Sequence, residues 1–149
     1  MNDLQLSESF TLSEFVRSNT AVRKGINNVP NAKHIANMTA LCVNVLQPIR
    51  WAIKAKISIS SGYRCQALNK AIGGSATSQH TEGKAADISA DGFTTEGLYQ
   101  VIKNSGLEFD QLIQEFNEWV HVSYNPGANR RQCLRAFKNG KATVYEVDK

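Results

Sequence analysis

The sequence predicts an α+β fold in which helices pack on a small, mainly antiparallel sheet. Apolar residues recur at helical spacing in the first third of the chain, whereas short alternating segments dominate the last third. Helices and strands therefore fall in separate runs, which disfavours a sheet built from βαβ units. With 149 residues the chain can bury a core without disulfide bonds, and we expect residues 1–149 to form one domain.

Helices are expected first. Thr11-Leu12-Ser13-Glu14 is a capping-box sequence and predicts a short helix that ends near Ser18. The turn-rich residues 25–30 separate it from a longer helix, in which Pro48 should kink the chain or end the regular part. One side of the longer helix is apolar and is formed by Ile35, Met38, Leu41, Cys42, Val45 and Ile49.

The middle of the chain predicts two strands with a short helix and a loop between them. The strands are expected at residues 56–60 and 85–89, and the helix at residues 64–71. The loop that follows this helix, residues 74–83, carries His80.

The last third predicts one more helix and then two pairs of strands. The helix begins at Thr94 or Thr95 and ends near Ser105. Each strand pair surrounds a turn, at Asn117-Glu118 and at Asn139-Gly140. The four strands are expected at residues 109–116, 119–124, 133–138 and 141–147.

Composition narrows the functional classes. The chain has three cysteines, an odd number, and no two are close in sequence: Cys42, Cys65 and Cys133. This argues against a disulfide framework and against a cysteine-based metal site. No apolar run is long enough to span a membrane, and the first residues lack the basic and apolar regions of a signal peptide. The net charge of +4 favours anionic partners without choosing between nucleic acid, acidic glycopolymers and a bacterial wall.

Three residues have the donor atoms of a metal site. His80 and Asp87 flank a glycine-containing loop, and a loop followed by a strand can aim both side chains at one point. These two residues alone are explained equally well as a loop histidine and a surface aspartate without a metal. His121 adds a second imidazole on a strand whose valines, Val120 and Val122, point to the other face. Two histidines and a carboxylate are a ligand set of catalytic zinc sites, which keep one coordination position open.

A carboxylate and an arginine complete the candidate chemistry. Glu118 lies at a turn three residues before His121, where its side chain can lean toward a zinc-bound water and take its proton. The alternative is a turn glutamate in solvent, and Glu115 competes for the role at a looser spacing. Arg64 follows the strand end Ser60-Ser61-Gly62-Tyr63 and can bind a carboxylate through two hydrogen bonds, or remain solvated.

These motifs together resemble a known family. Ser-Gly-Tyr-Arg, Ser-Gln-His-Thr-Glu-Gly-Lys-Ala-Ala-Asp and Glu-Trp-Val-His are similar to the zinc D-Ala-D-Ala carboxypeptidases and related murein peptidases of the Hedgehog/DD-peptidase fold. The likeness covers most of the chain. Phe-Thr-Leu-Ser-Glu-Phe and Gly-Ile-Asn-Asn near the N-terminus resemble the bacterial and phage branch.

The resemblance implies roles for individual residues. One zinc ion would be bound by His80, Asp87 and His121, with Glu118 as general base and acid. Arg64 would steady the substrate carbonyl or carboxylate. The remaining substrate-binding residues would be Ser78, Gln79 and Trp119.

The function expected from this resemblance is hydrolysis of a peptide bond in the murein stem or cross-link, by a carboxypeptidase or an endolysin-type endopeptidase. We expect a monomer that is made in the cytoplasm without a signal peptide and acts on the bacterial wall, as a phage or prophage product. A second hypothesis is a zinc-binding structural or wall-binding protein of the same fold without hydrolysis. A third is a nucleic-acid binder, although no nucleic-acid motif accompanies the basic cluster Arg130, Arg131, Arg135, Lys138 and Lys141.

Overall fold

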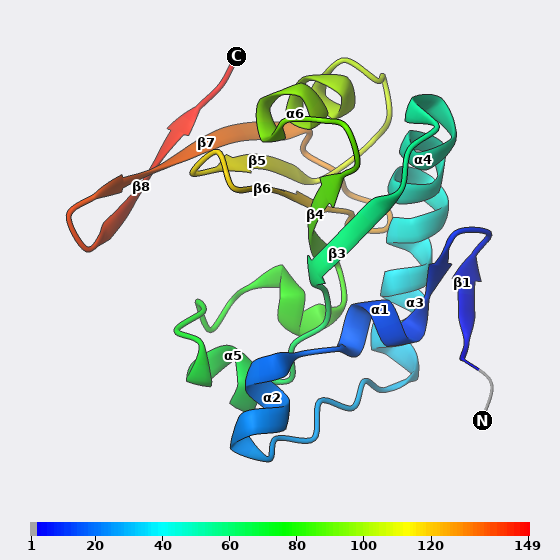
Figure 1. Ribbon diagram of the computed structural model, residues 1–149, viewed down its shortest axis with the longest axis vertical. Coiled ribbons are helices and arrows are strands. Elements are labelled where there is room, and N and C mark those ends of the chain that lie inside the picture. Colours follow the sequence, from blue (N-terminus) through cyan, green and yellow to red (C-terminus); the bar gives the residue numbers. More distant parts are fainter. Residues whose placement is uncertain (1–2) are drawn as a thin grey trace.

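The computed structural model describes residues 3–149. Its N-terminal part is mainly helical (Figure 1) and comprises β1 (Gln5–Ser7), β2 (Phe10–Thr11), α1 (Leu12–Val16), α2 (Asn19–Lys24), α3 (Ala32–Leu41), η1 (Cys42–Leu46) and α4 (Gln47–Ile53). The predicted capping box is present, because the Thr11 N–H donates to Glu14 Oε1 at 3.0 Å. The short strands β1 and β2 and helix α2 were not predicted.

The predicted long helix is built from α3, η1 and α4. Its middle segment, η1, is a π-helix in which the Gln47 N–H bonds to the Cys42 carbonyl, five residues back. Pro48 follows directly and has no N–H for the α-helical bond to Asn44, so the hydrogen-bond pattern changes just before it. The regular α-helix ends at Leu41 and resumes with α4 at Gln47, so the predicted interruption lies in the turns just before Pro48, and Pro48 itself stands in the first turn of α4. The predicted apolar side is buried, apart from a half-buried Ile35.

Six strands form the main sheet, in the order β3-β4-β6-β5-β7-β8. Their bounds are β3 (Ile57–Ser61), β4 (Ala85–Ala90), β5 (Gln111–Glu115), β6 (Trp119–Ser123), β7 (Gln132–Asn139) and β8 (Ala142–Val147). Only β5 and β7 run parallel, and the other neighbouring strands of this sheet are antiparallel. The predicted α+β class with a mainly antiparallel sheet is confirmed.

The two faces of this sheet have different environments. One face packs on helix α6 (Thr95–Lys103), and its strand residues, among them Ile88, Val120 and Val122, belong to the same buried core as Leu98 of α6 (Figure 1). The opposite face is covered only in part. Helix α5 (Gln66–Ala71) and the 3₁₀ helix η2 (Gln79–Glu82) belong to the segment that follows β3 on that side.

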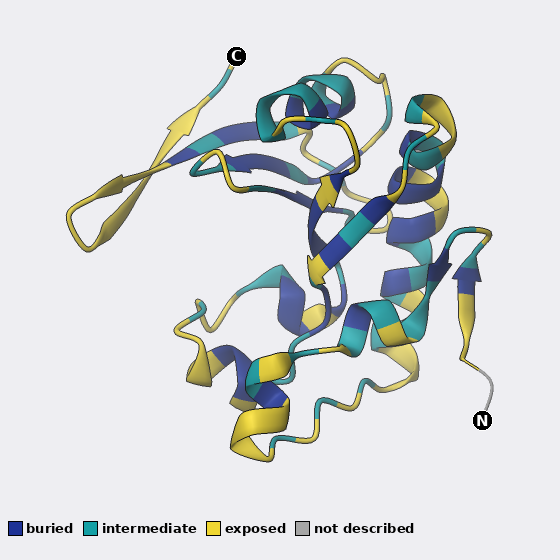
Figure 2. Ribbon diagram, viewed as in Figure 1, coloured by how far each residue is buried: buried dark blue, intermediate teal, exposed yellow. Residues whose placement is uncertain are grey.

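The β7–β8 hairpin extends the sheet beyond the body of the protein. All of β8 and the outer end of β7 are exposed, whereas the inner part of β7 is largely buried (Figure 2). Asn139 pairs with Ala142, so the two-residue loop of the hairpin is Gly140-Lys141 rather than the predicted Asn139-Gly140. Of the two loop residues, Gly140 has a positive φ, of 63°. Such a turn, with glycine first, matches the twist of the paired strands.

Candidate metal centre

Strand register places two of the predicted ligands on one face of the sheet. Asp87 of β4 lies opposite His121 of β6, and His121 lies opposite Ile113 of β5. Directly opposed residues share a face of an antiparallel sheet, so Asp87 and His121 project together, away from the core that buries Val120 and Val122. The predicted alternation of β6 is confirmed.

The third ligand comes from the 3₁₀ helix η2. The Ser78 hydroxyl caps this helix by accepting a hydrogen bond from the His80 N–H at 3.2 Å. Gly83 ends it with a φ of 76°, and a Cβ atom there would lie 2.6 Å from the His34 carbonyl oxygen. A glycine is therefore required where the chain turns from His80 toward β4.

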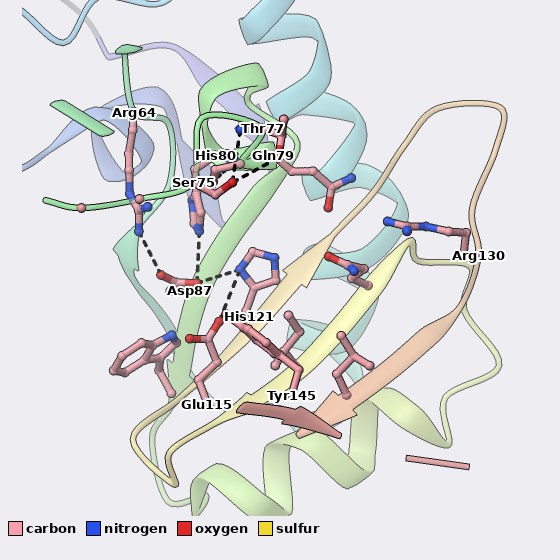
Figure 3. A pocket seen from close by; sticks show the side chains of 17 residues that line it. Arg64, Ser75, Thr77, Gln79, His80, Asp87, Glu115, His121, Arg130 and Tyr145 are labelled. Atoms are coloured by element: carbon pink, nitrogen blue, oxygen red, sulfur yellow. Dashed lines mark hydrogen bonds and ion pairs between the residues drawn. The ribbon is translucent and has the colours of Figure 1, made fainter. Parts of the chain in front are cut away.

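The two histidine side chains converge on the carboxylate of Asp87 (Figure 3). His80 Nε2 lies 3.2 Å and His121 Nδ1 lies 3.1 Å from Asp87 Oδ1. One ligand atom from each residue lies within 4.8 Å of the others, and all three residues are buried. Burial opposes ionisation of Asp87, but its interactions with the His121 and His80 rings outweigh burial and lower the pKa, so Asp87 is a carboxylate.

The contacts of His80 indicate that this group suits a cation. His80 Nδ1 lies 2.7 Å from the Gly62 carbonyl oxygen, which can only accept, so Nδ1 carries the hydrogen. A neutral ring then turns the lone pair of Nε2 toward a carboxylate oxygen. A second proton is disfavoured, because burial lowers the pKa of His80. A metal ion bound by both Nε2 and the carboxylate would accept electron pairs from these two atoms. The contact with the Gly62 carbonyl fixes the orientation of the ring, as in other metal-binding histidines.

Arg64 lies beside this cluster, as predicted. Its Nη2 is 3.5 Å from Asp87 Oδ2, and its Nε donates to Ser61 Oγ at 2.9 Å. The Arg64 backbone N–H also donates to the His80 carbonyl at 3.1 Å, which ties the arginine to the ligand-bearing helix. The guanidinium is therefore held at the edge of the site by its neighbours on both sides.

The structure does not bring Glu118 to the site. Glu118 is exposed and does not line the cavity, whereas Glu115 lines it and its Oε1 lies 3.9 Å from His121 Nδ1. The reason is the loop length. Glu115 pairs with Trp119, so the loop between the strands has three residues, of which Phe116 and Asn117 have positive φ, and Glu115 lies on the same face as His121. Glu118 was preferred to Glu115 for its turn position and its closer spacing to His121, whereas the structure places Glu115 beside that histidine.

The cluster opens into a cavity of about 600 Å³. Its floor is the partly covered face of the sheet, and one wall is the segment from Gly73 to His80, where the predicted substrate residues Ser78 and Gln79 lie. Trp119, also predicted, lines the cavity as well. The sequence reasoning missed several further lining residues, namely Ser75, Thr77, Gln111, Ile113, Arg130, Leu134 and Tyr145.

Two polar atoms of the lining residues are buried without a partner within residues 3–149: Gln79 Oε1 and Trp119 Nε1. The other end of the Gln79 amide is anchored, because Nε2 donates to Asp110 Oδ2 at 2.8 Å. Arg130 binds the same carboxylate through Nε and Nη2, at 2.9 and 2.7 Å. Asp110 therefore joins the wall that carries His80 to the loop that carries Arg130.

Comparison with protein families identifies the chain. A family model described as Peptidase M15 matches residues 8–123, a segment that includes His80, Asp87 and His121. The chain belongs to the peptidase M15 family. Strands β7 and β8 of this M15 peptidase lie beyond the matched segment. Among curated proteins, no match was found.

Family membership supports the metal assignment at a general level. M15 peptidases are zinc-dependent and act on peptidoglycan-type substrates, which agrees with a cluster of two histidines and an aspartate that can bind a metal ion. The resemblance to D-Ala-D-Ala carboxypeptidases noted in the sequence is confirmed at the level of the family. Within residues 3–149, no helix has the length and apolar character needed to cross a membrane.

Proposed function

We propose that this M15 peptidase hydrolyses a peptide bond in the murein stem or cross-link, as a D-Ala-D-Ala carboxypeptidase or an endolysin-type endopeptidase. The observation that carries the proposal is the buried convergence of His80, Asp87 and His121 beside the carboxylate of Glu115, at the floor of an open cavity. Three protein ligands beside an open space are typical of catalytic zinc sites, whereas structural sites are closed by a fourth ligand.

His80 Nε2, the Asp87 carboxylate and His121 Nδ1 would hold one Zn²⁺. When bound, zinc supplies a Lewis acid that polarises a carbonyl group and lowers the pKa of water from 15.7 to about 7. The protein contributes the orientation of the ligands. Gly62 fixes the His80 ring, and Arg64 lies beside Asp87 Oδ2.

Glu115 is proposed as the group that moves the proton. It would accept a proton from the attacking water and deliver it to the departing amine nitrogen, so that water is divided between the new carboxylate and the new amine. Its side chain is only 14% exposed. Burial raises the pKa of Glu115, and the nearby His121 opposes this shift. A raised pKa suits a carboxylate that must both accept and donate a proton near neutral pH.

Arg64 is proposed to bind the substrate carbonyl or a terminal carboxylate of the peptide. Its Nε and Nη1 donate to Ser61 and Asn69, which leaves the Nη2 end beside the cavity and the carboxylate of Asp87. A planar guanidinium held in this way presents fixed donors to a developing negative charge. Ser78, Gln79 and Trp119 would contact the rest of the peptide from the walls of the cavity.

The proposal is tested with purified murein and mass spectrometry of the released fragments, which also identifies the bond. Glu115→Gln should bind a wild-type amount of zinc and lose at least 100-fold in rate, about the contribution of general acid–base catalysis. Glu118→Gln is the matched control and should cleave at the wild-type rate. His80→Ala should lose zinc by elemental analysis. Full hydrolysis by Glu115→Gln would refute the base assignment, and zinc-dependent murein binding without cleavage by the wild type would favour a wall-binding protein.

We also propose that residues 1–149 act as a single, monomeric peptidase domain at the bacterial wall, as in a phage or prophage lysin. The single domain is supported by β7, which lies beside β5 in the sheet that carries the ligands, although it follows the family-matched segment. Size-exclusion chromatography with light scattering tests the monomer, and lysis of intact cells exposed to the protein from outside tests access to the wall.

A further inference from the structure

The β7–β8 hairpin brings one aromatic residue to the candidate site from outside the family-matched segment. In the sheet register, Glu115 lies opposite Ala136 of β7, and Ala136 lies opposite Tyr145 of β8. Glu115, Ala136 and Tyr145 therefore form one row across three strands, on the face that carries His121.

Ala136, in the middle of this row, is too small to separate the side chains of Glu115 and Tyr145. Neighbouring strands lie about 4.8 Å apart, so the Cα atoms of Glu115 and Tyr145 are separated by about 10 Å. Ala136 has no side chain beyond Cβ and is itself buried. The Tyr145 ring can thus lie over Ala136 and reach toward Glu115, and both residues line the same cavity (Figure 3).

The Tyr145 hydroxyl is free for a ligand. Tyr145 is 54% exposed, and within residues 3–149 its hydroxyl has no hydrogen-bond partner. Tyr99 provides a contrast, because its hydroxyl donates to Asp148 Oδ2 at 2.6 Å. The neighbouring Val144 pairs with Phe137, so it lies on the opposite face of the hairpin, away from the cavity.

The surroundings of Tyr145 suit a peptide with small apolar side chains. Ile113, Leu134 and Ala136 form a separate buried apolar cluster on the cavity side of the sheet. Ile113 and Leu134 line the cavity next to Tyr145. An apolar floor with a phenol at its border can bury the methyl group of an alanine and still offer a hydrogen-bond donor to the peptide backbone.

We propose that Tyr145 positions the substrate: its hydroxyl donates a hydrogen bond to a backbone carbonyl of the peptide held over Glu115, and its ring forms the wall of the subsite floored by Ile113 and Leu134. This inference rests on the peptidase function proposed above. It makes the C-terminal hairpin part of the substrate site, and Tyr145 a residue that contributes to substrate choice.

The test compares Tyr145→Phe, Tyr145→Ala and the control Val144→Ala with the wild type on soluble murein peptides. Tyr145→Phe should lower kcat/KM about fivefold to tenfold, the effect of one lost neutral hydrogen bond. Tyr145→Ala should lower it further and raise KM, because the wall is lost. Val144→Ala should match the wild type, and all three variants should retain the wild-type Tm and zinc content.

The results separate this inference from the function on which it rests. A wild-type kcat/KM for Tyr145→Phe would overturn the role of the hydroxyl. An equal loss in Val144→Ala would overturn it too, because the effect would then come from the hairpin as a whole. If Glu115→Gln is inactive while both Tyr145 variants are fully active, the peptidase function stands and only the role of Tyr145 fails. If the wild type does not cleave any peptide, the function itself fails.

Discussion

Replacement of Asp110 by asparagine should weaken both the fold and the wall of the cavity. The Asp110 side chain is only 3% exposed. It accepts hydrogen bonds from the Arg130 backbone, the Arg130 guanidinium and the Gln79 amide. An asparagine preserves the shape but removes the charge, and it turns an NH₂ group toward a donor.

The magnitude follows from the pKa of the carboxyl group. Hydrogen bonds from Arg130 lower the pKa of Asp110 from 3.8 to about 2. This difference corresponds to an upper limit of about 2.5 kcal/mol at neutral pH. The Arg130 side chain is 57% exposed, so solvent screens the pair, and we expect Asp110→Asn to lower the free energy of unfolding by about 1–2 kcal/mol.

The same argument fixes the sign of the pH dependence. Folding lowers the pKa of Asp110, so its stabilising contribution is complete above the unfolded pKa and is lost as the pH falls through about 2. The difference between the wild type and Asp110→Asn should therefore be full at pH 7 and about half as large at pH 3.

Urea unfolding at several pH values measures this difference. Glu108→Gln is the matched control, because Glu108 is exposed and its substitution removes one negative charge two residues away from Asp110. It should change the free energy of unfolding by less than about 0.5 kcal/mol. The reasoning would be refuted if Asp110→Asn lowered the free energy of unfolding by less than this value at pH 7. It would also be refuted if the difference between the wild type and Asp110→Asn did not become smaller toward pH 3.

Two further predictions concern the metal and the loop that carries His80. Removal of metal by a chelator should lower the Tm by about 10 °C and zinc should restore it, since zinc at 1,000 times its Kd stabilises by about 4 kcal/mol; an unchanged Tm in calorimetry would count against a zinc site. Gly83→Ala should destabilise by about 3 kcal/mol or more and reduce zinc binding, because φ is positive and Cβ would meet the His34 carbonyl oxygen. Gly92→Ala has a similar φ but open space, and it should cost only about 1 kcal/mol; equal costs in denaturant titrations would contradict the steric argument.

The order of elements and the fold class could be predicted from the sequence because they depend on local signals. Helical spacing, the capping box at Thr11 and alternation in the later strands each act over a few residues. The unpredicted parts include strands that are too short to show a pattern of their own. For example, β1 and β2 have only three and two residues, and they are stabilised by pairing with each other rather than by their own pattern.

The candidate site was predictable to the extent that its residues sit in specific motifs. His80, Asp87, His121 and Arg64 come together as the motifs suggested. Glu118 was chosen over Glu115 for its closer spacing to His121 along the chain. The strand pairing that brings Glu115 to this face follows a three-residue loop in which Phe116 has a positive φ, and residue types alone do not predict such a loop. The contribution of Tyr145 depends on β7 pairing in parallel with β5, which nothing in the local sequence of the hairpin specifies.

The pairing of Asp87 with His121 links metal binding to folding of the sheet. The two ligands lie opposite each other on β4 and β6, and a slip of one residue between these strands would turn Asp87 or His121 to the core face. A slipped sheet would then have only part of the ligand set, and it would bury a charge among apolar side chains. A zinc ion bound by both residues would stabilise only one alignment of the two strands, so the ion proposed for hydrolysis would also select the native sheet during folding.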